Sequence, residues 1–195
     1  MSICNEVSDS VSVDDQILDA ARSCVLDFGL RRTTLAEVAR RAGVSRPTVY
    51  RRWPDTRAVV ADLLTREISV VIPDMDGDEP ARVQLVRAVV DVATGMGTHP
   101  LFVKILRSDP DLLMPYIVDR IGTSQRAIIE RISQAVVAGQ ADGSIRPGEP
   151  AHLAAMVLLI GQSAVQSAGM VAEVLPPEEL ARELQFAVDN YLAPR

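Results

Sequence analysis

Apolar residues recur at steps of three and four positions along most of the chain, which is the spacing of one face of an α-helix. The first such segment covers residues 13–28 and stops before Gly29, a residue type that commonly ends helices. Two short segments follow it, residues 35–42 and 46–52. The pattern therefore predicts one longer helix and then two helices of only about two turns each.

Hydroxyl side chains stand before both short segments. Thr33 or Thr34 precedes the first segment, and Ser45 precedes the second. Such side chains cap a helix by accepting hydrogen bonds from the N–H groups of its first turn. Pro47 falls in the first turn of the second segment, where its missing N–H is harmless. We therefore expect both helices to begin at these positions and Asp55 to cap a fourth helix.

The rest of the chain keeps the helical spacing and shows no strand-like alternation. Two segments rich in Pro, Gly and Asp interrupt it, residues 73–80 and 141–150. A further break is expected at residues 95–100. The predicted helices of this part cover residues 83–92, 101–106, 111–140, 151–174 and 177–192. The predicted fold class is therefore all-α.

The two short helices are joined by Gly43, Val44 and Ser45, which is the arrangement of a helix-turn-helix. Gly43 can take a positive φ without the penalty of a Cβ atom, and Ala39 is small enough for two helices to cross closely. In a helix-turn-helix the second helix enters the major groove of DNA. A purely structural corner between two helices is the alternative.

Charge favours the DNA-binding interpretation. The chain has a net charge of −6, yet residues 31–57 contain eight arginines against two acids. A local basic patch can bind DNA phosphates whatever the total charge, because binding releases condensed counterions. The alternative is a solvated helix face whose arginines form salt bridges within the protein.

The outward residues of the second short helix suit different contacts with DNA. Arg46 or Arg51 can bind guanine O6 and N7 in a bidentate manner. Pro47 and the methyl group of Thr48 can touch a thymine methyl. The hydroxyl of Tyr50 can donate to a phosphate. This helix therefore combines base-reading and phosphate-binding candidates.

Residues 33–64, TTLAEVARRAGVSRPTVYRRWPDTRAVVADLL, closely resemble the DNA-binding signature of TetR-family transcriptional regulators. The resemblance implies that Thr33 or Thr34 contacts a phosphate. The contacts that it implies on the second short helix come from Ser45, Arg46, Pro47, Thr48 and Tyr50. The family often has a lysine at the start of the fourth helix for a phosphate; here that residue is Thr56, so Arg57 is the expected replacement.

The order of the later helices is also similar to the ligand-binding and dimerisation domain of this family. The resemblance implies an N-terminal three-helix bundle with the helix-turn-helix, joined through the fourth helix to a larger C-terminal helical domain. The expected division is a flexible tail over residues 1–12, a DNA-binding domain over residues 13–58, and a ligand-binding and dimerisation domain over residues 59–195.

The resemblance further implies a ligand pocket in the larger domain. The candidate lining residues are Met96, His99, Phe102, Leu106, Met114, Tyr116 and Gln125. Methionines and a few polar groups in an apolar cavity suit a mainly hydrophobic small molecule. At helical spacing these residues fit a packed core as well, and His99 fits a partly exposed loop.

The last two predicted helices are the most apolar pair and are candidates for a dimer interface. The candidate residues are Gly161, Ala164, Ala168, Leu180, Leu184, Val188 and Tyr191. Two such helices from each of two subunits can form a four-helix interface with two-fold symmetry. The alternative is that these residues complete the core of one subunit.

No group of residues suited to catalysis is evident. The only two histidines, His99 and His152, lie far apart, and there is no Gly-rich phosphate loop or nucleophile motif. Cys4 and Cys24 indicate neither a disulfide framework nor a metal site. We therefore expect no enzymatic activity, no cofactor and no metal.

The N-terminal residues lack the basic start and apolar run of a secretory signal, and the longest apolar run, residues 153–160, is too short to span a bilayer. We expect a cytoplasmic protein without membrane contact. The sequence thus predicts a TetR-like homodimeric repressor that a small, mainly hydrophobic ligand releases from a palindromic operator in double-stranded DNA. The alternative is a helix-turn-helix protein without a ligand switch, such as an architectural or recombination partner.

Overall fold

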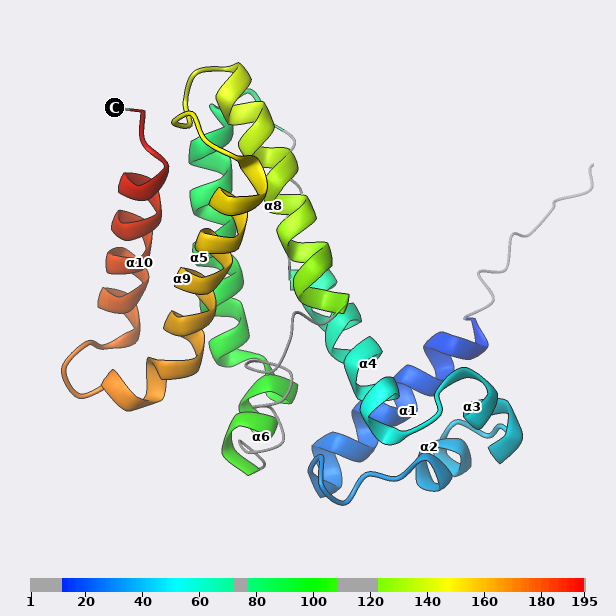
Figure 1. Ribbon diagram of the computed structural model, residues 1–195. Coiled ribbons are helices and arrows are strands. Elements are labelled where there is room, and N and C mark those ends of the chain that lie inside the picture. The colour runs from blue at the N-terminus through cyan, green and yellow to red at the C-terminus, as the bar shows by residue number, and fades with distance from the viewer. Residues whose placement is uncertain (1–11, 72–76, 109–122, 195) are drawn as a thin grey trace, which may run out of the picture.

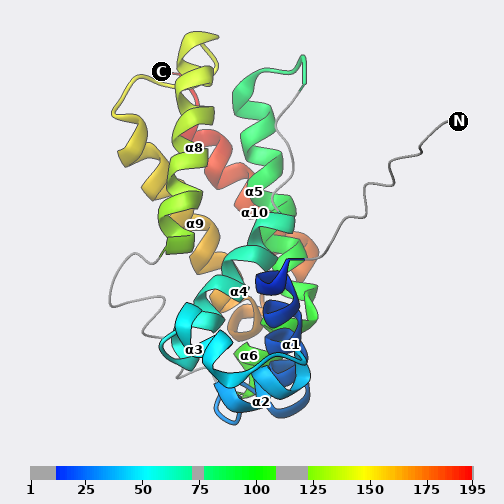
Figure 2. The ribbon, with the colours of Figure 1, turned by 90° about the vertical axis from the view of Figure 1, so that its right-hand side faces the viewer.

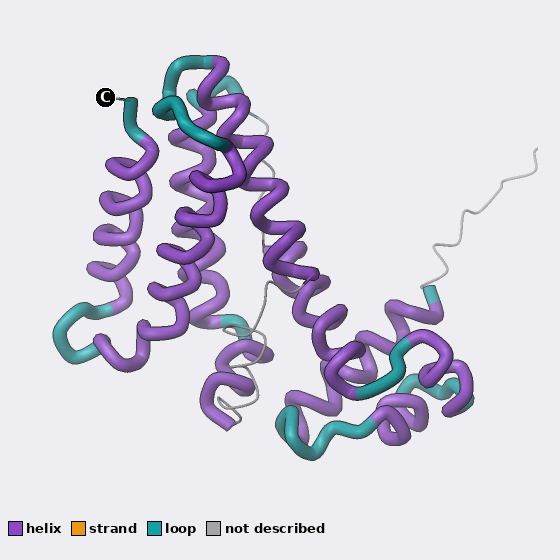
Figure 3. Tube along the Cα trace, in the orientation of Figure 1, coloured by secondary structure: helices purple, strands orange, loops and turns teal. Residues whose placement is uncertain are grey.

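The computed structural model describes residues 12–71, 77–108 and 123–194, and the regular elements in these ranges are all helices (Figures 1 and 3). Their bounds are α1 Val13–Phe28, α2 Leu35–Arg41, α3 Arg46–Arg52, α4 Thr56–Val71, α5 Ala81–Thr98, α6 Pro100–Ser108, α8 Thr123–Ala141, α9 Pro150–Val171 and α10 Pro177–Leu192. The all-α prediction is confirmed.

The predicted capping residues lie at the starts of the N-terminal helices. The hydroxyl of Thr34 accepts from the N–H of Glu37 at 3.2 Å, so Thr34 caps α2. Ser45 caps α3 in the same way, at 3.3 Å from the N–H of Thr48. The carboxylate of Asp55 accepts from the N–H of Ala58 at 2.8 Å. Local chemistry therefore fixes where these helices begin.

The predicted break at residues 95–100 is wrong for most of its length, because α5 continues to Thr98. A glycine inside a helix costs only about 1 kcal/mol relative to alanine, which the packing of a long helix can offset. The chain leaves the helix only at His99, whose φ of −68° and ψ of 124° are extended. His99 precedes Pro100, and a residue before proline is disfavoured in the helical region.

The predicted helix at residues 111–140 is described only from Thr123, where α8 begins. α9 ends at Val171, three residues before the predicted end at residue 174. The described part of α8 and both final helices otherwise follow the predicted pattern.

Two hydrophobic cores hold the described helices together. The first joins α1, α2, α3 and the first half of α4, and α6 adds Leu101, Phe102 and Ile105 to it. The second joins α5, α8, α9 and α10 around residues such as Leu85 and Val136. Figures 1 and 2 show α1–α3 at one end of the molecule and the bundle of α5, α8, α9 and α10 at the other, with α4 running between them.

The proposed domain boundary at residue 58 lies inside α4. This helix is continuous from Thr56 to Val71, and its residues Val59, Val60, Leu63 and Leu64 are buried in the first core. One rigid helix therefore belongs to the N-terminal core at its start and reaches the C-terminal bundle at its end.

Helix α9 is apolar on two sides. Leu153, Ala154 and Val157 are buried in the second core, whereas Met156 and Leu159 are exposed. Among the described residues it is the one helix long and apolar enough to cross a membrane by length and composition, with a mean hydropathy of 1.5. The sequence argument from residues 153–160 missed this, because it counted an uninterrupted run rather than the whole helix.

Candidate DNA-binding surface and effector cavity

The turn between α2 and α3 depends on a residue without a side chain. Gly43 has a φ of 65°, in the left-handed region. The N–H of Val44 then donates back to the carbonyl of Ala39 at 3.1 Å. Ala39 and Val49 are buried where the two helices cross. This geometry packs Val49 of α3 in the first core and leaves the opposite face of the helix outward, as a helix-turn-helix requires.

Replacing Gly43 with alanine is expected to lower the free energy of unfolding by about 1–2 kcal/mol, the usual cost of a left-handed conformation for a residue with a Cβ. No atom lies within 4 Å of a Cβ built on Gly43, so backbone conformation is the whole effect. Urea unfolding measures the change. Gly43→Asn is the control and should cost less, because asparagine tolerates this region. Equal costs for the two variants would contradict the explanation.

The outer face of α3 is exposed. Arg46, Pro47, Tyr50 and Arg51 all reach solvent, and 52% of Tyr50 is accessible. Ser45 is exposed at the cap, and its hydroxyl lies 2.7 Å from that of the partly buried Thr48. The predicted recognition residues therefore share one accessible surface.

Three arginines of the basic segment form ion pairs within the protein. Arg40 and Arg41 form ion pairs with Glu37 at 2.7 and 3.2 Å, and Arg41 forms another with Asp27 at 2.6 Å. Arg52 forms an ion pair with Asp14 of α1. These arginines fit the alternative of salt bridges within the protein.

Arg46 and Arg51 behave differently. Neither makes a hydrogen bond or ion pair with any residue that the structure describes, and both are exposed. An unpaired guanidinium loses no intramolecular partner when it binds a phosphate or a base, so these two arginines of α3 are well placed for DNA.

The two candidate threonines also differ. Thr33 is buried, and its hydroxyl donates to the carbonyl of Gly29 at 2.9 Å. Thr34 is exposed at the start of α2. Thr33 was a predicted phosphate contact, and the structure places its side chain inside the first core instead. Arg57 is exposed at the start of α4, beside Thr56.

Glu37 has the most perturbed carboxyl group of this surface. Hydrogen bonds from the Arg40 and Arg41 guanidinium groups lower the pKa of Glu37 from 4.5 to about 2. The lower pKa means that the folded state favours the ionised form. Its contribution to stability is therefore present above about pH 4.5 and lost as the pH falls toward 2.

Replacing Glu37 with glutamine is expected to destabilise the protein at neutral pH and to have progressively less effect below about pH 4.5. Urea midpoints of the wild type and the variant, measured at several pH values, give the comparison. A difference that stays constant down to pH 2.5–3 would contradict the assigned pKa.

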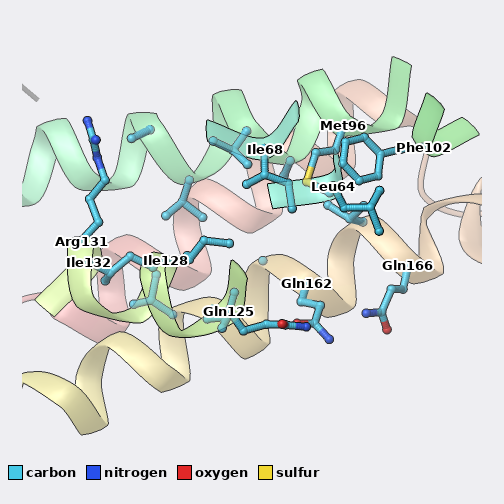
Figure 4. Close-up of a pocket in the computed structure, with 18 of the residues that line it drawn as sticks. Leu64, Ile68, Met96, Phe102, Gln125, Ile128, Arg131, Ile132, Gln162 and Gln166 are labelled. Carbon is cyan, nitrogen blue, oxygen red and sulfur yellow. The ribbon is translucent and has the colours of Figure 1, made fainter. Parts of the chain in front are cut away.

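A cavity of about 210 Å³ lies between α4, α5, α8 and α9, with α6 at one end (Figure 4). Four of the predicted pocket residues line it, namely Met96, Phe102, Leu106 and Gln125. Met114 and Tyr116 lie outside the described residues. Most of the lining that the sequence did not single out is apolar, including Leu64, Ile68 and Val89.

His99 does not line the cavity. It lies at the corner between α5 and α6, where its Nε2 is 3.2 Å from Oε2 of the buried Glu67. The same oxygen accepts from Nε of Arg22 at 3.1 Å, and the His99 ring packs against Phe102 at 5.3 Å. His99 is not among the described lining residues of the cavity, whereas its extended backbone and its 20% exposed side chain agree with the interpretation as a partly exposed loop residue. Its contact with Glu67 of α4 was not predicted, because the two residues are distant in the sequence.

The predicted interface residues mainly serve the subunit's own packing. Leu184 and Val188 are buried in the second core, which Ala164 and Tyr191 also contact. Gly161 lines the cavity instead, with Val89 3.5 Å from its Cβ position. The apolar periodicity of α10 correctly marked a buried face, but the burial is inside one subunit. Leu180 and Ala168 are partly buried.

Comparison with known proteins identifies the chain. Residues 17–63 match the family model described as bacterial regulatory proteins, tetR family. An uncharacterised helix-turn-helix transcriptional regulator of Mycobacterium tuberculosis is 45% identical over 185 residues, which cover 95% of this chain and 97% of that protein. The chain belongs to the TetR family. It is therefore a helix-turn-helix transcriptional regulator of a family that binds DNA and has no enzymatic activity.

Solved structures share the TetR fold. A TetR-family regulator from Rhodococcus sp. superposes with a TM-score of 0.71 at 20% identity, covering 93% of this chain and 98% of that one. A Saccharomonospora viridis regulator in complex with choline has a TM-score of 0.61 at 15% identity, covering 93% and 98%. SmeT of Stenotrophomonas maltophilia in complex with triclosan has a TM-score of 0.60 at 20% identity, covering 92% and 89%.

Proposed function

We propose that this TetR-family regulator is a cytoplasmic, homodimeric repressor that binds a palindromic operator and leaves it when a small, mainly hydrophobic effector fills the cavity. The observation that carries the proposal is a single helix, α4. Asp55 caps it beside the recognition helix α3, and Leu64 and Ile68 of the same helix line the cavity. Helix α4 therefore connects the DNA-binding surface to the cavity.

The proposed DNA contacts lie on the exposed face of the helix-turn-helix. Arg46 and Arg51 read bases, since both guanidinium groups are exposed and unpaired within the described residues. Pro47 and Thr48 contact apolar base edges, and Tyr50 a phosphate. Thr34, Ser45 and Arg57 are further phosphate contacts, because they lie at the starts of α2, α3 and α4.

The proposed dimer uses the outer face of α9 and α10. Met156, Leu159 and Met170 on α9, and Phe186 on α10, are exposed by 42%, 57%, 80% and 67%. Large apolar side chains gathered on two adjacent helices mark an interaction surface. A second copy of the chain, related by a two-fold axis, covers the same face on both subunits, and its symmetry matches a palindromic operator.

The proposed switch works through α4. Glu67, on the last turns of α4, binds Arg22 of α1 and His99 at the α5–α6 corner. A ligand that shifts the cavity wall at Leu64 and Ile68 therefore moves a helix that is tied to the DNA-binding core. The effect equals the difference in ligand affinity between the two arrangements, typically about 1–3 kcal/mol. The choline and triclosan complexes of proteins with this fold support a small effector.

The proposed switch requires that operator DNA weaken effector binding by the same factor by which the effector weakens operator binding. Once operator DNA is identified, an effector found by screening should bind the operator-bound protein about 5- to 150-fold more weakly than the free protein. Calorimetric titration with and without operator gives both affinities. Identical affinities would mean that the ligand is not an inducer, and the chain would then act as a DNA-binding protein without this switch.

A further inference from the structure

The recognition helix α3 has only seven residues, and Val49 is the one buried residue among them. Among the described helices it packs mainly on α2. Its start is fixed by the turn at Gly43 and by the cap at Ser45. A helix this short can tilt about a start that is fixed, so the contacts at its end decide how steadily its outer face is held.

Trp53 closes the end of α3. Its backbone N–H donates to the carbonyl of Val49 at 2.9 Å, which completes the last turn of the helix. The residue is 5% exposed and belongs to the first core, to which α4 contributes Val59 and Val60. The position of this ring in the core is therefore coupled to the end of the recognition helix.

A hydrogen bond ties the same ring to α4. The indole Nε1–H of Trp53 donates to Oδ2 of Asp62 at 2.7 Å. Asp62 lies in the second turn of α4 and is exposed. A charged acceptor makes such a bond stronger than one between neutral groups. Apolar packing keeps the ring in the core, whereas this directional bond fixes how the ring is turned and so how α3 lies against α4.

The end of α3 is also tied to α1, but by a more exposed contact. Arg52 forms an ion pair with Asp14, and these side chains are 30% and 56% exposed. Exposed ion pairs contribute little to stability, and salt screens them. The Trp53–Asp62 bond has a neutral donor on a buried ring, so salt weakens it less. It is therefore the firmer of the two contacts.

We propose that Trp53 and Asp62 are positioning residues for DNA recognition, because their hydrogen bond holds α3 at the angle to α4 at which its outer face reads bases. Base reading requires side chains placed to within about 0.5 Å and 10–20°. Phosphate contacts carry no sequence information and supply most of the binding to random DNA. Loss of the bond therefore lowers affinity for the operator more than affinity for random DNA. This inference rests on the proposed function in taking α3 as the element that reads bases.

Two substitutions at the exposed Asp62 test the bond. Asp62→Ala removes the acceptor, whereas Asp62→Asn removes the same charge and keeps an oxygen acceptor. Fluorescence anisotropy at one salt concentration gives the affinities for random DNA and for the operator selected from it. Asp62→Ala should lower the ratio of operator affinity to random-DNA affinity by about three- to tenfold, the value of one hydrogen bond. Asp62→Asn should keep the ratio of the wild type.

Trp53→Phe tests the donor, because it removes the N–H and keeps an aromatic ring in the core. It should lower the ratio at least as much as Asp62→Ala. In the Trp53→Phe background, Asp62→Ala should change the ratio no further, since the bond is already gone. Circular dichroism shows whether each variant is folded. If Trp53→Phe does not fold, the comparison of Asp62→Ala with Asp62→Asn still decides.

A purely structural role gives a different result. Asp62→Ala would then lower the urea midpoint and leave the ratio of the two DNA affinities unchanged, which would overturn the inference. An equal fall of the ratio in Asp62→Asn would also overturn it, because the charge rather than the hydrogen bond would be responsible.

The arginines of α3 separate this inference from the proposed function. If Arg46→Ala and Arg51→Ala lower the ratio and Asp62→Ala does not, base reading by α3 stands and the positioning role fails. If Asp62→Ala lowers the ratio and the arginine variants do not, the positioning role stands and the bases are read by other residues of α3.

Discussion

Replacing Leu184 with arginine is expected to unfold the bundle of α5, α8, α9 and α10. Leu184 is 5% exposed and packs in the second core of a single subunit. A guanidinium there would be buried without a partner, so the free energy of unfolding should fall by about 4 kcal/mol or more. Loss of the helical circular dichroism signal, or a urea midpoint near zero, would record the result.

Phe186→Arg is the matched variant on the same helix. Phe186 is 67% exposed and lies on the proposed dimer face. This variant should keep the helical content of the wild type but sediment as a monomer at micromolar concentration. If Leu184→Arg instead gave a folded monomer and Phe186→Arg a folded dimer, the dimer face would have to be placed on the other side of α10. If the protein instead copurified with membranes, the exposed apolar face of α9 would be assigned to contact with lipid.

Removing both Arg46 and Arg51 is the second change with a large expected effect. Each alanine substitution should weaken operator binding by about 1–3 kcal/mol if the guanidinium reads a guanine in a bidentate manner. Stability should not change, because neither side chain has a hydrogen bond or ion pair within the described part of the chain. Fluorescence anisotropy on operator and on random DNA measures both affinities.

Arg57→Ala is the control for a phosphate contact. It should weaken binding to operator and random DNA alike. The slope of binding affinity against salt concentration should then correspond to about one counterion fewer released. If the Arg46 and Arg51 variants behaved in the same way, these two arginines would contact phosphates only, and base reading would belong to other residues of α3.

The helix-turn-helix could be predicted closely because its determinants are local. Thr34, Ser45 and Asp55 each bond an N–H three residues ahead, and Gly43 sets the turn by its own φ. Interactions over so few residues leave a clear pattern in the sequence. The resemblance to the TetR family then extended this local pattern to the whole fold.

The cavity and the junction at His99 could not be predicted in the same detail. Glu67 brings together Arg22 from α1 and His99 from the α5–α6 corner, and no spacing in the sequence indicates that meeting. Periodicity marks which face of a helix is apolar, but not whether a core, a cavity or a second subunit covers it. Leu184 and Gly161 were therefore assigned to the interface although one fills the core and the other lines the cavity.

Selection of bound sequences from random DNA by the purified protein tests whether a symmetric dimer binds DNA through α3. A symmetric dimer that reads DNA with α3 should enrich an inverted repeat whose half-site centres lie about one helical turn, roughly 10 base pairs, or a multiple of it apart. The Arg46→Ala and Arg51→Ala double variant should lose that enrichment. An enriched sequence without two-fold symmetry, or the same enrichment by the double variant, would contradict the account.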